Sequence, residues 1–173
     1  MNHNYRLIFK WLLYLLVYAV WVVLQTNVLP FLTLFGARPN MLPVAAAMVA
    51  VLEGGVPGAL FGVFAGLCCE AVMPFHVIYL IWFFLSGLLI GNLVAALFKK
   101  TFVTAALCGL ASLTVLDFFA MLFFFLIPRR AGLSALTPVA LSEIACSALL
   151  TPFVYWPLKA VSRMGEKELE GEQ

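Results

Sequence analysis

The sequence predicts an all-α, polytopic membrane protein with six transmembrane helices. Hydrophobic residues make up 65% of the 173 positions and charged residues only 10%, whereas soluble domains carry about 25% charged residues. The apolar residues fall in blocks of roughly 20, which is the length that a helix needs to cross a hydrocarbon core about 30 Å thick. The lysines and arginines lie between or beside these blocks.

The first block runs from Trp11 to about Leu29, after a short N-terminal segment, residues 1–10. Gln25-Thr26-Asn27 near its end and Pro30 after it stand where a signal peptide would have a small-residue cleavage site, so we expect a retained span and no signal peptide. The second block, Met41 to Leu52, would rise only about 18 Å as a helix. It is therefore expected to be short, tilted or re-entrant.

The third block, Val56 to Met73, follows the second after a break at Glu53-Gly54-Gly55. Glycine permits tight turns. We therefore expect the short second helix to form a tight hairpin with the third.

The remaining blocks have ample length to span a membrane. The fourth runs from Val77 to Phe98, the fifth from Phe102 to Ile127, and the sixth begins near Leu136. Residues 11–161 are thus predicted to form one transmembrane domain. The tail, residues 162–173, is rich in Glu and Lys without apolar periodicity and is expected to be disordered.

The basic residues predict the orientation, because cytoplasmic loops carry the excess of Lys and Arg. Six crossings place seven basic residues on the side of the two termini and three on the other. Treating the second and third blocks as one broken span gives four against six. The count therefore favours six crossings with both termini cytoplasmic, while a re-entrant hairpin at 41–73 gives the same count and stays open. The seven are Arg6, Lys10, Lys99, Lys100, Lys159, Arg163 and Lys167, and the three are Arg38, Arg129 and Arg130.

Two faces of small residues are predicted on the hairpin. Small residues four positions apart let helices approach closely, which favours association in lipid. We expect these two faces to meet, or one of them to receive a helix of another protein. The third block carries Gly58, Gly62 and Gly66, with Glu70 next in the series, and the second carries Ala46, Ala50 and Gly54.

Four carboxylates lie in or beside the apolar blocks: Glu53, Glu70, Asp117 and Glu143. Charges near the membrane centre are costly and usually face the bundle interior, a cavity or a partner. Glu53 and Glu70 lie near block ends, where they can reach the interface. For Asp117 and Glu143, a buried structural hydrogen bond and a functional role are both open.

The sequence gives little support for catalysis, and we expect neither a cofactor nor a metal site. His3 and His76 are the two histidines, so no imidazole lies inside a block to activate a nucleophile or to hold a catalytic zinc. There is no glycine-rich phosphate loop. The net charge of +2 does not suggest nucleic acid. The cysteines lack the CxxC spacing of a redox or metal site, which favours small buried side chains; they are Cys68, Cys69, Cys108 and Cys146.

The hairpin carries a set of motifs that resembles the MreD family of bacterial rod shape-determining membrane proteins. In that family a Pro-Asp-Leu-Leu-like start opens the second segment, and a glycine ladder leads to an acidic residue. Asn40 stands where the family usually has Asp, which removes a charge, and Glu70 replaces the usual Asp. The motif residues in this chain are Arg38-Pro39-Asn40-Met41-Leu42, Glu53-Gly54-Gly55, Gly58 to Leu67, Glu70, and Gly87 and Gly91 in the next segment.

The resemblance implies a non-enzymatic scaffold in the cytoplasmic (inner) membrane of a bacterium. It implies a role in organising side-wall peptidoglycan synthesis and maintaining rod shape. The implied partners are a single-span MreC-like protein, the peptidoglycan polymerase and transpeptidase of the elongation complex, and MreB-like filaments. A second reading is a small-molecule-binding membrane subunit of a vitamin-type importer, because six helices in about 170 residues also match the size of such subunits.

Overall fold

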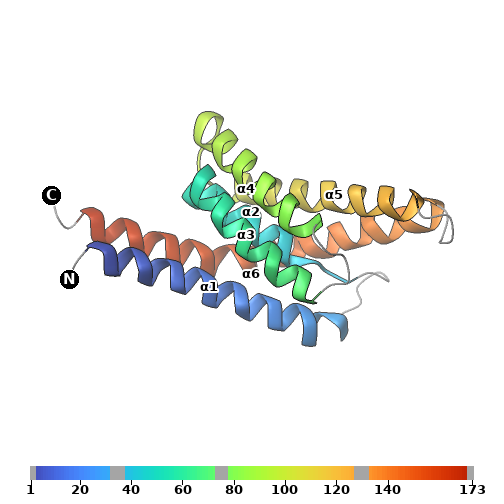
Figure 1. Ribbon diagram of the computed structural model, residues 1–173, viewed down its shortest axis with the longest axis horizontal. Helices are drawn as coiled ribbons and strands as arrows, with labels where there is room; N and C mark the ends of the chain where they lie inside the picture. Colours follow the sequence, from blue (N-terminus) through green and yellow to red (C-terminus); the bar gives the residue numbers. More distant parts are fainter. Residues whose placement is uncertain (1–2, 32–37, 73–77, 127–132, 171–173) are drawn as a thin grey trace.

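The computed structural model describes residues 3–31, 38–72, 78–126 and 133–170, and within them it contains six α-helices and one short 3-10 turn (Figure 1). The all-α prediction is confirmed. The elements are α1 (His3–Asn27), η1 (Leu29–Phe31), α2 (Met41–Glu53), α3 (Gly55–Val72), α4 (Ile78–Leu97), α5 (Phe102–Leu126) and α6 (Leu133–Glu170). The bounds of α2, α3, α4 and α5 follow the apolar blocks closely, whereas α1 begins at His3, ahead of the block predicted from Trp11.

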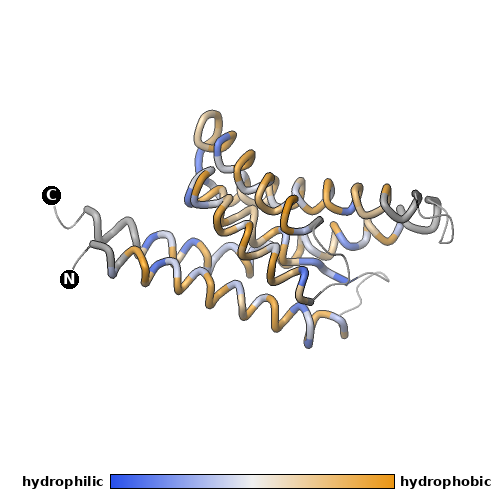
Figure 2. The backbone as a smooth tube through the Cα atoms, viewed as in Figure 1, coloured by the Kyte–Doolittle hydropathy of each residue, from blue (hydrophilic) through white to orange (hydrophobic). Residues whose placement is uncertain are grey.

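The helices have the length and composition of a multi-pass membrane protein. Four of them, α1, α4, α5 and α6, are long and apolar enough to cross a membrane, and α2 and α3 are shorter apolar helices. Apolar residues are spread along all the helices rather than confined to one stripe (Figure 2). This distribution suits helices whose outer faces lie in lipid.

The short helix α2 forms the centre of the bundle. Every residue from Met41 to Leu52 is buried, and α2 packs against all five other helices. Its side chains are apolar and mostly small, with four alanines in the helix. A helix of 13 residues rises only about 20 Å, so enclosure by longer neighbours keeps its ends away from lipid.

A single residue joins α2 to α3. Gly54 lies between Glu53, the last residue of α2, and Gly55, the first of α3, and its φ is +102°. L-residues rarely adopt this left-handed conformation, whereas glycine does so at little cost. The predicted tight hairpin is therefore present.

The two termini lie at the same end of the bundle, which we call the termini end; the opposite end is the far end (Figure 1). The α2–α3 turn is also at the termini end, since Glu53 contacts Lys10 of α1. The link between α4 and α5 lies there too, because Lys100 donates a hydrogen bond to the carbonyl of Leu52. Successive helices therefore alternate in direction.

The sixth helix corrects one expectation. Disorder was expected from residue 162, but α6 continues as a helix to Glu170. Lys, Glu, Leu and Met are good helix formers, and a helix that is already nucleated adds such residues readily. Residues 171–173 of the predicted tail, as well as Arg129, Arg130 and His76, lie outside the described residues.

Candidate functional site

The glycine face of α3 packs against α4, which runs antiparallel to it. A Cβ atom on Gly62 would meet the backbone of Phe83, and one on Gly66 would lie 2.5 Å from the Cα atom of Leu80. Such contacts are far closer than real Cβ atoms show. At both positions, therefore, only a hydrogen side chain lets the two helices pack at this distance.

The glycines that the family resemblance singled out in α4 complete this contact. A Cβ atom on Gly87 would lie 2.6 Å from the carbonyl oxygen of Gly58, and one on Gly91 would meet the backbone of Gly54 and Gly55. The α3–α4 pair is thus held by glycines on both helices. This arrangement leaves no room on the face for a helix from another protein.

A small residue of α2 meets this face at Gly58. A Cβ atom on Gly58 would lie 2.6 Å from the Cα atom of Ala50. Ala46 is buried in α2, but Gly62 and Gly66 face α4 instead. The two faces therefore meet at Gly58 and Ala50, whereas the nearest neighbours of Gly62 and Gly66 belong to α4.

Glu53 connects three parts of the chain at the termini end. Its Oε2 atom lies 2.6 Å from Nζ of Lys10, and the hydroxyl of Tyr14 donates a 2.6 Å hydrogen bond to Oε1. Beside it, Nζ of Lys100 donates a 2.6 Å bond to the carbonyl of Leu52. The acid that the sequence placed at a turn therefore fixes that turn to α1. Lys10 and Tyr14 could not be identified as its partners from the sequence, because they lie 43 and 39 residues away along the chain.

Glu70 connects the far ends of α3 and α4. Its Oε1 atom accepts a 3.1 Å hydrogen bond from the backbone N–H of Leu80, in the first turn of α4. The first N–H groups of a helix lack partners within it, and the helix dipole favours negative charge there. Glu70 therefore stabilises the start of α4.

The chain enters α2 through an irregular segment, residues 38–40, that is partly buried. Arg38 is exposed, whereas Pro39 and Asn40 are buried. The amide of Gln25 donates to the carbonyl of Pro39 at 2.8 Å and accepts from the N–H of Met41 at 3.1 Å. Irregular backbone at membrane depth requires such partners from the protein, since lipid offers none.

A second helix also binds this segment. Oγ of Ser147 in α6 accepts a 3.0 Å hydrogen bond from the N–H of Asn40. One turn earlier on the same face of α6 lies Glu143, which is half-buried. The start of α2 is thus tied to α1 on one side and to α6 on the other.

Asp117 of α5 completes this cluster. It lies close enough to Glu143 for the two charges to repel each other. Gln25, Asn40, Asp117, Glu143 and Ser147 together form what we call the polar junction. Asn40 was predicted as a motif residue, and Asp117 and Glu143 as intramembrane acids. Nothing in the sequence indicated that the three lie near one another.

Two buried oxygen atoms of the polar junction have no hydrogen-bond partner among the described residues: Oδ1 of Asn40 and Oδ2 of Asp117. Asn40 is 8% exposed. Buried polar atoms are nearly always paired, and an unpaired one costs about 1–3 kcal/mol. The polar junction therefore contains two buried acceptor atoms without a hydrogen-bond partner in the described part of the chain.

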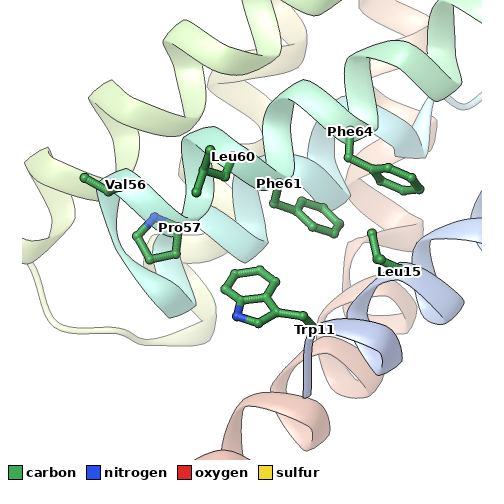
Figure 3. A pocket seen from close by; sticks show the side chains of 7 residues that line it. All are labelled: Trp11, Leu15, Val56, Pro57, Leu60, Phe61 and Phe64. Atoms are coloured by element: carbon green, nitrogen blue, oxygen red, sulfur yellow. The ribbon is translucent and has the colours of Figure 1, made fainter. Parts of the chain in front are cut away.

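An apolar groove runs between α1 and α3 near the termini end (Figure 3). Its volume is about 450 Å³. Trp11 projects from α1 toward Pro57 and Phe61 of α3, and Leu60 and Val56 lie along the α3 side. The remaining lining residues are Leu15 and Phe64. We call this the α1–α3 groove.

The side chains that could bind a metal are scattered. Within the described ranges, no three His, Cys, Asp or Glu side chains come together in a way that could hold a metal ion. Cys69 and Cys146 are buried, Cys68 and Cys108 are half-buried, and none of the four forms a disulfide.

Comparison of the chain with family models, with curated proteins and with solved structures gives no match.

Replacing Gln25 with leucine is expected to lower the free energy of unfolding by about 1–3 kcal/mol, because the carbonyl of Pro39 and the N–H of Met41 both lose their partner. Chemical unfolding in mixed detergent micelles measures the change. Asn27→Leu is the matched control, since Asn27 is exposed and its side chain bonds only within α1 and to Thr26. A Gln25 variant as stable as this control would contradict the role assigned to Gln25.

Proposed function

We propose that this chain is a non-enzymatic membrane scaffold of the MreD type, which helps to organise peptidoglycan synthesis and maintain rod shape. The observation that carries the proposal is the place of the motif residues. The segment 38–42 leads into the central helix, and Gly54 makes the hairpin turn. Gly58, Gly62 and Gly66 allow α3 to pack closely against α4. The residues behind the resemblance are thus those that build this bundle.

The scaffold is proposed to lie in the inner membrane with six crossings and both termini in the cytoplasm. The alternating helix directions support this orientation, as do the basic residues at the termini end. Lys10, Lys99, Lys100 and Lys159 lie there, and Arg38 lies at the far end. Reaction of single cysteines with an impermeant thiol reagent, in intact cells, tests it: a cysteine placed at Arg38 should react and one placed at Lys99 should not.

The proposed partner is a single-span, MreC-like protein, whose transmembrane helix would lie along the α1–α3 groove. The glycine face is covered by α4, so a docking surface must lie elsewhere on the bundle. The groove offers apolar walls on two helices and an indole, Trp11, that can pack against a partner's side chains. Contacts with the synthase enzymes and with filaments would then be made by this pair of proteins together.

Leu60→Trp should fill the groove and lower co-purification of the single-span partner at least about tenfold, equivalent to about 1.4 kcal/mol. Leu60 is 66% exposed, so the bulkier side chain does not disturb the core. Leu107→Trp is the matched control, because Leu107 is 63% exposed on α5. Equal co-purification of both variants would exclude the groove. Absence of any stoichiometric single-span partner from the wild-type protein would overturn the scaffold function.

The second candidate function, a substrate-binding subunit of a vitamin-type importer, is favoured by a different observation. The unpartnered oxygens of Asn40 and Asp117 are acceptors of the kind that fix a small polar molecule in a membrane bundle. Co-purification distinguishes the two functions. A scaffold brings down a single-span protein, whereas an importer subunit brings down an energising ATPase pair and a bound small molecule.

A further inference from the structure

The termini end of α5 and α6 is strongly basic. Lys99 and Lys100 lie in the link before α5, and Lys159 and Arg163 lie on α6. Glu53, whose side chain the structure describes at this end, is already held in an ion pair elsewhere. None of the four basic side chains forms an ion pair with a side chain that the structure describes. Their positive charge is therefore not balanced by the described acids.

Lys159 is held at the contact between α5 and α6. Its Nζ atom lies 5.1 Å from the ring centre of Tyr155, one turn earlier in α6. The Tyr155 ring in turn packs edge-on against Phe102, the first residue of α5, with 5.1 Å between the ring centres. The ammonium group thus lies beside the first turn of α5. We call these three residues the α5–α6 seam.

The α5–α6 seam positions the ammonium group without neutralising it. A tyrosine ring attracts a cation through its quadrupole, but it carries no charge. Tyr155 is 2% exposed, and Lys159, which lies over it, is half-buried. A cation that has lost part of its water and has no acid beside it is costly. A bound anion at this position would offset that cost.

Arg163 places a second positive charge next to the first. It is exposed and follows Lys159 by four positions, so the two side chains are neighbours on one face of α6. Like charges at this spacing repel each other and destabilise a helix. An ammonium and a guanidinium are also the two groups that bind phosphate oxygens in proteins. A phosphate between them would therefore replace a repulsion with two attractions.

Large apolar side chains continue this face of α6 toward the middle of the bundle. Phe153 and Trp156 precede Lys159 at intervals of three positions, and both are exposed. Val103, in the first turn of α5, is exposed as well. Tryptophan is typical of the level at which lipid headgroups meet acyl chains. The face is thus basic at the termini end and apolar below it, which matches a lipid with an anionic head.

We propose that the α5–α6 seam binds an anionic phospholipid, whose phosphate lies against Lys159 and Arg163 and whose acyl chains lie along Trp156 and Phe153. The phosphate oxygens accept hydrogen bonds from both basic side chains. A zwitterionic lipid brings the same phosphate together with its own ammonium, so it leaves the excess positive charge unbalanced. Basic surfaces between membrane helices bind anionic headgroups in this way.

The apolar part of the face assigns the ligand to a lipid rather than to a free phosphate ion. A free phosphate would use the two charges and would leave Trp156 and Phe153 without a role. The proposal does not depend on the scaffold function, because α5 and α6 form this seam, whereas α1 and α3 form the groove assigned to the protein partner.

The experiment uses the full chain in nanodiscs that contain equal amounts of phosphatidylglycerol and phosphatidylcholine with identical acyl chains. Native mass spectrometry then counts the lipids that stay bound after extraction. We expect phosphatidylglycerol to be retained about tenfold over phosphatidylcholine. Equal retention of the two lipids would overturn the proposal.

Lys159→Gln and Arg163→Gln should each lower this preference about fivefold, which is the effect of one basic residue near an anionic headgroup, whereas Lys159→Arg should keep it. Arg38→Gln is the matched control, because it removes one exposed positive charge at the far end. If the control loses as much preference as Lys159→Gln, the lipid responds to total charge alone and the proposed site is excluded. If a variant fails to fold, the others and the wild-type comparison still decide.

Two substitutions of Tyr155 test the α5–α6 seam without changing any charge. Tyr155→Phe keeps the ring under Lys159 and should keep the preference, whereas Tyr155→Leu removes the ring and should weaken it. The melting temperature of each variant shows that the protein is folded. A folded Tyr155→Leu protein with the full preference would contradict the placement of the lipid at this seam.

A second arm tests a free anion. The protein is placed in nanodiscs of phosphatidylcholine alone, and its melting temperature is measured with inorganic phosphate and with chloride at equal ionic strength. Stabilisation by phosphate, without a lipid preference in the first arm, would overturn the assignment to a lipid. Retention of phosphatidylglycerol supports the proposal whether or not phosphate also stabilises the protein, because both present the same oxygens to Lys159 and Arg163.

Discussion

Gly62→Leu is expected to force α3 away from α4 and to lower the free energy of unfolding by about 3 kcal/mol, the upper end of what overpacking costs in a close-packed core. A Cβ atom alone would already meet the backbone of Phe83. Backbone cannot move aside as a flexible side chain can, so the whole helix must shift. Gly62→Ala should therefore also destabilise the protein, by about 1–2 kcal/mol.

Unfolding by sodium dodecyl sulfate in mixed micelles measures both Gly62 variants. Ala71→Leu provides the control. Ala71 lies on the same helix and is exposed, so the change adds a similar apolar bulk toward lipid. The expected order of stability is wild type and Ala71→Leu together, then Gly62→Ala, then Gly62→Leu. A Gly62→Leu protein that unfolds like wild type but loses a partner would show that the face binds another protein.

The elements of the fold were predictable because the apolar blocks are separated by strong breaks. Pro30, Gly54 and Lys99-Lys100 each interrupt a block, and the helices end within a few residues of these positions. Lipid demands helices of a set length, so block length alone carries the prediction. The continuation of α6 past Val161 was not predicted. The many charged residues there favour disorder, whereas their helix propensity favours a helix, and composition alone does not decide between the two.

The pairing of the helices was far less predictable. Spacing four apart identified Gly58, Gly62 and Gly66 as one close-packing face, but α2 and α4 both offered small residues that could meet it. Which of them does so depends on the rotation of α3 about its axis. A residue pattern with period four leaves the direction of its face in the bundle undetermined, and only the packing of all six helices fixes it.

The polar junction shows the same limit for a candidate site. Asn40, Asp117 and Glu143 were each identified as unusual, since acids and amides are costly in lipid. Their convergence required the depth of α2, which begins inside the bundle and so brings Asn40 to the level of the two acids. Gln25 and Ser147 were not identified. Their role depends on the irregular backbone of residues 39–41, which they hydrogen-bond, and the sequence does not show that this backbone lies beside them.

Breaking the ion pair between Lys10 and Glu53 is expected to have an effect as large as that of Gly62→Leu. The two side chains are 18% and 11% exposed and 2.6 Å apart, so removing one leaves the other charged and largely buried. Removing one partner of a buried ion pair lowers the free energy of unfolding by about 3–5 kcal/mol. Glu53→Leu also removes the carboxylate that accepts the hydrogen bond of the Tyr14 hydroxyl, so it should be the less stable of the two single variants.

A double-mutant cycle separates the pair from its surroundings. Lys10→Met should destabilise the protein by about 3 kcal/mol and Glu53→Leu by more, up to about 5 kcal/mol. The loss in the double variant should be smaller than the sum of these two losses by about 1–3 kcal/mol, because no unpaired charge remains. Lys99→Met is the control, as Lys99 is an exposed lysine at the same end. Additive losses in the double variant would show that the two charges act independently and that the α2–α3 turn is fixed to α1 by packing alone.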